Sequence, residues 1–91
     1  MDKETELVEI RQKMKQLLVE QLSLEDITSE EIEDDMPLFG EGIGLDSLDA
    51  VEIVVLLQRN FDIEIKDLEK SRDVFKSVNT LAEYVYEKRH A

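Results

Sequence analysis

Several residue types that carry chemistry are scarce in this sequence of 91 residues. It contains no cysteine, so it can form no disulfide and no thiolate metal site. Its one histidine, His90, lies near the end of the sequence, and without a second histidine neither metal catalysis nor an activated serine nucleophile has support. We therefore expect a protein that is not an enzyme and that has no metal site.

Long apolar segments are also missing. The longest apolar run, residues 53–57, is far too short to cross a bilayer. The first ten residues lack the apolar core of a signal peptide. We expect a cytoplasmic protein that makes no contact with a membrane.

Basic residues are absent from more than a third of the chain. Residues 23–58 contain eleven acidic residues and no Lys or Arg, whereas the flanking segments are nearly balanced, so the net charge of −12 is concentrated in the middle. Such a segment would repel nucleic acid and attract a basic protein surface. A general role of the charge in solubility would not explain why the bases stop at Lys15 and resume at Arg59.

Turn-forming residues are few, with three glycines and one proline, which favours helices. Apolar residues recur at helical spacing at about residues 3–22, 47–60 and 77–88, and a short helix is expected at 66–73. We predict one domain over residues 1–91 with an all-α fold. It would be a small four-helix bundle of three longer helices and one short one.

A long loop is expected between the first two helices. Residues 23–45 lose the helical pattern and contain Pro37 and all three glycines. Loops of this length are uncommon in compact domains and are often functional. Leu38, Phe39 and Ile43 are the side chains that we expect to attach this loop to the bundle.

Two short segments have patterns that need interpretation. Residues 29–31, Ser-Glu-Glu, could open a helical turn within the loop. Residues 61–65 read FDIEI and alternate like a strand, but five residues without a partner strand are not stable as one. We expect an extended connection there.

Residues 44–50 read GLDSLDA and place Ser47 between two aspartates where the second helix is expected to begin. Asp46 and Ser47 are both good N-cap residues, and Asp46 with Asp49 is similar to a capping box. The helix that follows is apolar nearly all round, so it is either a central core helix or one that offers part of its surface to a ligand or partner. Asp49 and Glu52 form an exposed strip beside Ser47.

From the first helix to the final TLAEYV, the sequence resembles the acyl carrier protein family. The resemblance rests on residues that stand at the family's spacing, namely Asp46-Ser47-Leu48, Phe39 and Gly44 upstream, and Glu52 and Phe61-Asp62 downstream. It implies that a phosphopantetheinyl transferase attaches 4′-phosphopantetheine from coenzyme A to Ser47. The terminal thiol of this arm would then hold acyl groups as thioesters. Without the resemblance, a serine at this position is an ordinary cap.

The resemblance also implies roles for neighbouring residues. Asp46 would help to orient the transferase. The residues that would meet partner enzymes are Leu48, Asp49, Glu52 and Val55. Those that would line an acyl pocket beside the second helix, although each is equally explained as core, are Met14, Val54, Leu57 and Phe61. The expected partners are acyl-transferring and ketosynthase-type enzymes with basic surfaces, and the carrier itself is expected to be a monomer.

A phosphodiester on Ser47 would lie at a helix N-terminus. Free backbone N–H groups and the helix dipole would favour this anion by roughly 0.3–1 kcal/mol. The carboxylates of Asp46 and Asp49 would oppose it, which suggests that these two residues act on the incoming enzyme rather than on the product.

Some positions differ from the housekeeping fatty-acid carrier. Gly42 replaces the acidic residue that usually precedes the Leu-Gly of the motif, and Gln58 and Arg59 replace carboxylates at the end of the second helix. We expect a carrier of fatty-acid, polyketide or aryl-polyene-like biosynthesis that is not fused to a synthase. Aspartate rather than histidine before the serine favours acyl over aminoacyl cargo.

Two other functions remain open at this level. The chain could be an unmodified acidic helical adaptor that binds basic proteins through the same face. It could also be a small calcium-responsive bundle, although Met36, Pro37 and Leu38 interrupt the alternating acids that an EF-hand loop needs.

Overall fold

The computed structural model describes residues 2–25, 27–39, 42–66 and 73–90. Within these ranges it contains three α-helices, α1 (Lys3–Gln21), α2 (Ser47–Phe61) and α3 (Val78–Arg89), and the short 3₁₀ helices η1 (Ser29–Glu31) and η2 (Val74–Lys76). The prediction of a small all-α bundle with a long loop after the first helix is confirmed. The expected short helix at 66–73 falls largely on residues outside the described ranges.

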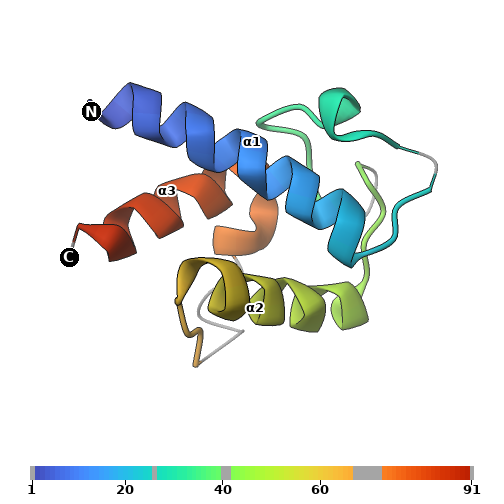
Figure 1. Cartoon of the computed structure of the whole chain (residues 1–91). Helices are drawn as coiled ribbons and strands as arrows, with labels where there is room; N and C mark the ends of the chain where they lie inside the picture. Colours follow the sequence, from blue (N-terminus) through green and yellow to red (C-terminus); the bar gives the residue numbers. More distant parts are fainter. Residues whose placement is uncertain (1, 26, 40–41, 67–72, 91) are drawn as a thin grey trace.

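Among the three α-helices, α1 packs most extensively against α3 and also contacts α2 (Figure 1). α1 runs antiparallel to both α2 and α3, so the start of α1 and the end of α3 lie at the same end of the molecule (Figure 1). There, Nε2 of His90 lies 2.7 Å from Oε2 of Glu6. His90 is therefore part of a surface contact between the chain ends.

The core is built from one face of each helix. Every third or fourth residue of α1 and α3 is buried, as the helical spacing of the apolar residues predicts. The buried helix residues are Leu7, Ile10, Met14 and Leu18 of α1, Ile53, Leu56, Leu57 and Phe61 of α2, and Val78, Leu81, Ala82 and Val85 of α3. The remaining core side chains come from the connections, among them Ile32, Leu38, Leu45, Ile63, Ile65 and Phe75.

The connection after α2 behaves as its alternating pattern predicts. Asp62 takes a left-handed conformation with φ 56° and ends the helix. Ile63 and Ile65 are buried while Glu64 is exposed, and residues 62–66 form neither helix nor strand. The extended connection is confirmed, as is the helical turn at residues 29–31.

Side-chain caps fix the starts of α1 and α3. The carboxylate of Asp2 accepts a hydrogen bond of 2.8 Å from the backbone N–H of Thr5, and this bond lowers the pKa of the Asp2 carboxyl. Ser77, which is buried, caps α3 through reciprocal bonds with Thr80. In the part of the chain that the structure describes, no helix combines the length and the apolar character needed to cross a membrane.

Candidate functional site

Backbone hydrogen bonds fix the loop that leads into α2. The N–H of Leu38 donates to the carbonyl of Lys76 at 3.1 Å, and the N–H of Leu45 donates to the carbonyl of Leu38 at 3.0 Å. Leu38 and Leu45 are buried, and Phe39 and Ile43 pack half-buried against the core. The expectation that Leu38, Phe39 and Ile43 attach the loop is confirmed, and the chain is therefore held in place just before α2 begins.

The start of α2 is a complete capping box. Oδ1 of Asp46 accepts hydrogen bonds from the backbone N–H groups of Leu48 at 3.0 Å and Asp49 at 3.2 Å. Oδ2 of Asp49 in turn accepts one from the N–H of Asp46 at 3.0 Å. The two aspartates thus fix the first helical turn, as the sequence pattern suggests.

Ser47 is the first residue of α2 and is exposed to solvent. The buried residue Leu45 and the capping box fix the backbone on either side of Ser47, so its side chain lies at the N-terminal end of α2. The expectation that free backbone N–H groups would stabilise a phosphodiester on Ser47 needs correction. The carboxylate of Asp46 already accepts hydrogen bonds from the N–H groups of Leu48 and Asp49. A phosphodiester at Ser47 fits the exposure and the positive end of the helix dipole, but these two N–H groups are not available to it unless the cap opens.

An exposed apolar strip runs along α2 from this start. Leu48 is 75% exposed and Val51 is 50% exposed, which is unusual for large apolar side chains on a small bundle. Val55 is half-buried and Glu52 is exposed beside them. Asp49 is half-buried, so the expectation that it lies with Glu52 on an exposed strip is correct for Glu52 and not for Asp49. One face of this helix is therefore core and the other is open to solvent, and binding of a ligand or partner by the open face stays a prediction.

Val51 was not among the predicted partner-facing residues. Its spacing of three residues from Leu48 and four from Val55 places the three on one side of the helix. That spacing was visible in the sequence, but Val51 could not be told from a core valine before the buried face of α2 was known.

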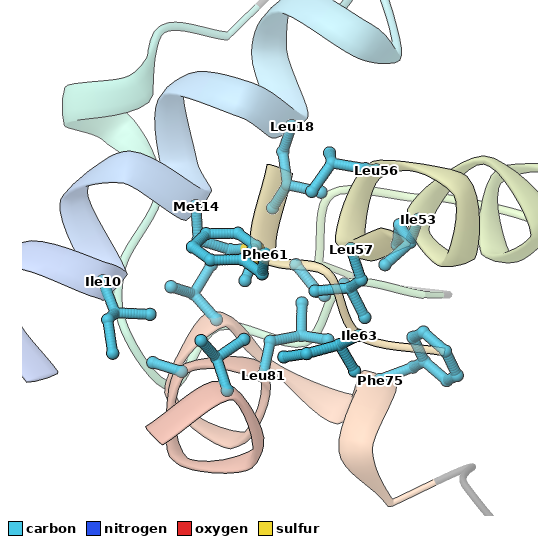
Figure 2. Packing of buried hydrophobic residues seen from close by; sticks show 14 of the residues in the cluster. Ile10, Met14, Leu18, Ile53, Leu56, Leu57, Phe61, Ile63, Phe75 and Leu81 are labelled. Atoms are coloured by element: carbon cyan, nitrogen blue, oxygen red, sulfur yellow. The ribbon is translucent and has the colours of Figure 1, made fainter. Parts of the chain in front are cut away.

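The four residues expected to line an acyl pocket lie in or against the core. Met14 and Leu57 are fully buried, Phe61 is buried, and Val54 is half-buried. Figure 2 shows Met14, Leu57 and Phe61 in the same cluster of packed side chains. The structure brings these residues together as core, and a role toward cargo stays a prediction.

Cations cover the ring of Phe61 at the far end of α2. Nζ of Lys13 and Cζ of Arg89 each lie 5.5 Å from the ring centroid. Such contacts between a cation and an aromatic ring are attractive. They tie the C-terminal end of α2 to both α1 and α3, at the opposite end of the helix from Ser47.

The acidic segment is partly neutralised by α1. Asp34 lies 2.8 Å from Nζ of Lys15 and 3.7 Å from Nε of Arg11. The carboxylates of Asp46 and Asp49 have a different role, because they accept backbone hydrogen bonds at the start of α2. Among the described residues, no three Asp, Glu or His side chains gather closely enough to hold a metal ion.

A match to a known protein family spans the start of α2, including Ser47. The family described as "Phosphopantetheine attachment site" matches residues 12–85. The chain is 37% identical over 76 residues to an acyl carrier protein of Akkermansia muciniphila, covering 84% of this chain and 88% of that protein. It is 36% identical over 91 residues to a D-alanyl carrier protein of Streptococcus sanguinis, covering all of both.

The chain belongs to the family of phosphopantetheine-binding carriers. Its members hold 4′-phosphopantetheine covalently and are not themselves enzymes. They interact with a phosphopantetheinyl transferase and with the enzymes of a pathway.

Proposed function

We propose that Ser47 is the residue that carries the phosphopantetheine arm and that the arm holds acyl intermediates as thioesters. The observation that carries this proposal is the exposed position of Ser47 as the first residue of α2, within the segment matched by the family. Ser77, by comparison, is buried and uses its hydroxyl in the cap of α3.

The arm supplies a thiol that this cysteine-free chain otherwise lacks. Because no protein thiol is present, an acyl group on the arm cannot be lost to one by thiol exchange. Ser47 would be the attachment point, and Asp46 caps the helix that carries it. Asp46 is also proposed to orient the transferase. Coenzyme A is a cytoplasmic metabolite, so the proposal includes a cytoplasmic location.

The proposed docking surface for pathway enzymes is the strip of Leu48, Val51 and Val55 with the carboxylates of Asp49 and Glu52. Exposed apolar side chains rimmed by charge are typical of protein interaction sites. The partner surfaces that complement it are apolar at the centre and basic at the rim. Glu52→Lys is expected to weaken binding of a pathway enzyme, with the effect decreasing as salt increases.

For the cargo, we propose acyl groups of fatty-acid, polyketide or aryl-polyene-like biosynthesis. Asp46 before Ser47 and the similarity to the Akkermansia acyl carrier support it. Met14, Val54, Leu57 and Phe61 would surround such a chain if it entered the bundle beside α2. D-alanine is the second candidate, because the similarity to the Streptococcus D-alanyl carrier extends over the whole of both chains.

Intact mass spectrometry tests the attachment site directly. The apo protein is incubated with coenzyme A, magnesium and a promiscuous phosphopantetheinyl transferase, and its mass should increase by one phosphopantetheine. Ser47→Ala should abolish the increase. Ser29→Ala is the matched control, because Ser29 also starts a helical turn followed by two acidic residues. A mass that stays unshifted in the parent protein would favour the unmodified adaptor.

The cargo is identified by the mass of the protein isolated from its native cell. An added acyl group on the arm would support the proposal, whereas an added alanyl group would assign the second candidate.

A further inference from the structure

An open groove of about 380 Å³ lies between the turn that follows α1 and the loop that precedes α2. Its volume is within the range of about 300–1,000 Å³ that is usual for small-molecule sites. The apolar side chains in it are half-buried and pack against the core, and the rest form a polar rim. The lining residues are Ser23, Leu24, Glu25, Ile27, Gly42 and Ile43.

Two tight turns build this groove. A Cβ atom on Gly42 would lie 1.7 Å from the carbonyl oxygen of Pro37, so the close approach of the two chain segments requires glycine. The N–H of Ile43 donates to that same carbonyl at 3.0 Å. On the other side, Ser23 takes a left-handed conformation with φ 52° where the chain leaves α1. The groove is therefore a consequence of the backbone and not of a loosely placed side chain.

We infer that this groove is the resting place of the unloaded phosphopantetheine arm, an inference that rests on the proposed attachment at Ser47. Ile43 precedes Ser47 by four residues, so their Cα atoms are at most about 14 Å apart. The arm has about fourteen bonds between the serine oxygen and the sulfur, roughly the length of five extended residues or about 16 Å. An arm attached to Ser47 is therefore long enough to reach the side of the groove that Gly42 and Ile43 form.

The chemistry of the groove matches the arm. The arm begins with a phosphodiester and a methylene group, which are followed by a carbon bearing two methyl groups and a carbon bearing a hydroxyl, and it continues through two amides, each followed by two methylene groups, to the thiol. The methylene groups beyond this carbon find apolar contacts with Leu24, Ile27 and Ile43. The amides remain at the polar rim, where the hydroxyl of Ser23 and the carboxylate of Glu25 accept hydrogen bonds. This combination of an apolar base and a few polar groups is typical of sites that hold a ligand in one orientation.

The alternative place for the arm is the core beside α2, which is closed in this structure. Met14, Leu18, Ile53 and Leu57 are fully buried there. Protein interiors are densely packed, so the arm could enter only if the helices separated. The groove is already open, and the short arm without cargo has little apolar surface with which to compensate for opening the core.

Nuclear magnetic resonance of the modified protein tests the inference. The protein is labelled with ¹⁵N and with ¹³C at its methyl groups, converted with coenzyme A and the transferase, and checked by intact mass. We expect amide shift changes at residues 23–25, 27 and 42–43 in addition to those near Ser47. We also expect nuclear Overhauser effects between the methylene groups of the arm and the methyl groups of Leu24, Ile27 and Ile43.

Ile27→Ser should remove the contacts with the arm while leaving the modification at Ser47 complete. Val8→Ser is the matched control, because Val8 is an exposed apolar residue of α1 that does not line the groove and should leave the contacts unchanged. If the parent protein is fully modified and shows neither shift changes nor contacts in the groove, the groove inference is wrong and the attachment stands. If the mass does not increase, the attachment at Ser47 is wrong and the groove inference fails with it.

Discussion

Nη1 of Arg11 in α1 donates a hydrogen bond of 3.1 Å to Oδ1 of Asn79 in α3, a residue 68 positions further along the chain. The backbone N–H of Asn79 donates to the carbonyl of Asp34 at 2.8 Å, and its side-chain amide donates to Oδ1 of Asp35 at 3.2 Å. Asn79 therefore joins both packed helices to the acidic loop. Because the same loop continues into α2, this junction contributes to the placement of Ser47.

The first prediction concerns this junction. Asn79→Ala removes two side-chain hydrogen bonds, both with charged partners, and is expected to lower the free energy of unfolding by about 1–3 kcal/mol. Urea denaturation followed by circular dichroism measures the change. Glu83→Ala, an exposed position of the same helix, should stay within about 0.5 kcal/mol of the parent. Equal stability of the two variants would show that the junction contributes nothing.

The second prediction separates the two roles of Asp46. Asp46→Ala removes the cap of α2 and should lower the free energy of unfolding by about 0.5–2 kcal/mol, whereas Asp46→Asn keeps a good cap and should be nearly as stable as the parent. Both variants lose the charge that we propose to orient the transferase, so both should be modified more slowly. Initial rates of modification, followed by intact mass, provide the measurement. Modification of Asp46→Asn at the parent rate would limit Asp46 to capping.

The third prediction concerns the turn at Gly42. Gly42→Ala places a methyl group against the carbonyl of Pro37, which must move, and the strain is expected to lower stability by about 1–3 kcal/mol. Thermal unfolding measures the loss, and the amide shift of Ile43 should report a weakened bond to Pro37. Glu25→Ala, an exposed change on the opposite side of the same groove, serves as the control. An unchanged melting temperature in Gly42→Ala would contradict the described turn.

The fourth prediction concerns the acidic segment. Carboxylates between residues 25 and 52 repel one another, so modest salt or magnesium should raise the melting temperature. Potassium chloride at matched ionic strength separates general screening from association of the divalent ion. The same screening weakens the Lys15–Asp34 ion pair. We expect the stability lost from this one pair to be smaller than the stability gained from reduced repulsion in a protein with a net charge of −12. A melting temperature that is flat or falls with magnesium would contradict this account.

Much of the fold could be predicted because it depends on local patterns. The helical spacing of Leu7, Ile10, Met14 and Leu18 defines the buried face of α1, and Ser77 before an apolar segment defines the start of α3. The capping box at the start of α2 was likewise visible, since its two aspartates are three residues apart. These features arise from interactions within a few residues, which a sequence displays directly.

The site was predictable in outline but not in detail. The sequence indicated Ser47 and its acidic neighbours, but not that Asp46 occupies the N–H groups of Leu48 and Asp49 at once. It also did not distinguish Val51, which is half exposed, from Val54, which packs against the core. The two valines differ only in which face of α2 the other helices cover.

The amino-acid sequence by itself determined the helical segments, the concentration of negative charge and the serine at the start of α2, because each depends on residues close together in the chain. The tertiary structure decided which apolar side chains are exposed, where the acidic loop is neutralised and where a groove forms between the turn after α1 and the loop before α2. Those properties depend on contacts such as Arg11 with Asn79 and on the close approach of Gly42 to Pro37. The geometry of such contacts is set by how the whole chain packs, and spacing along the sequence does not specify it.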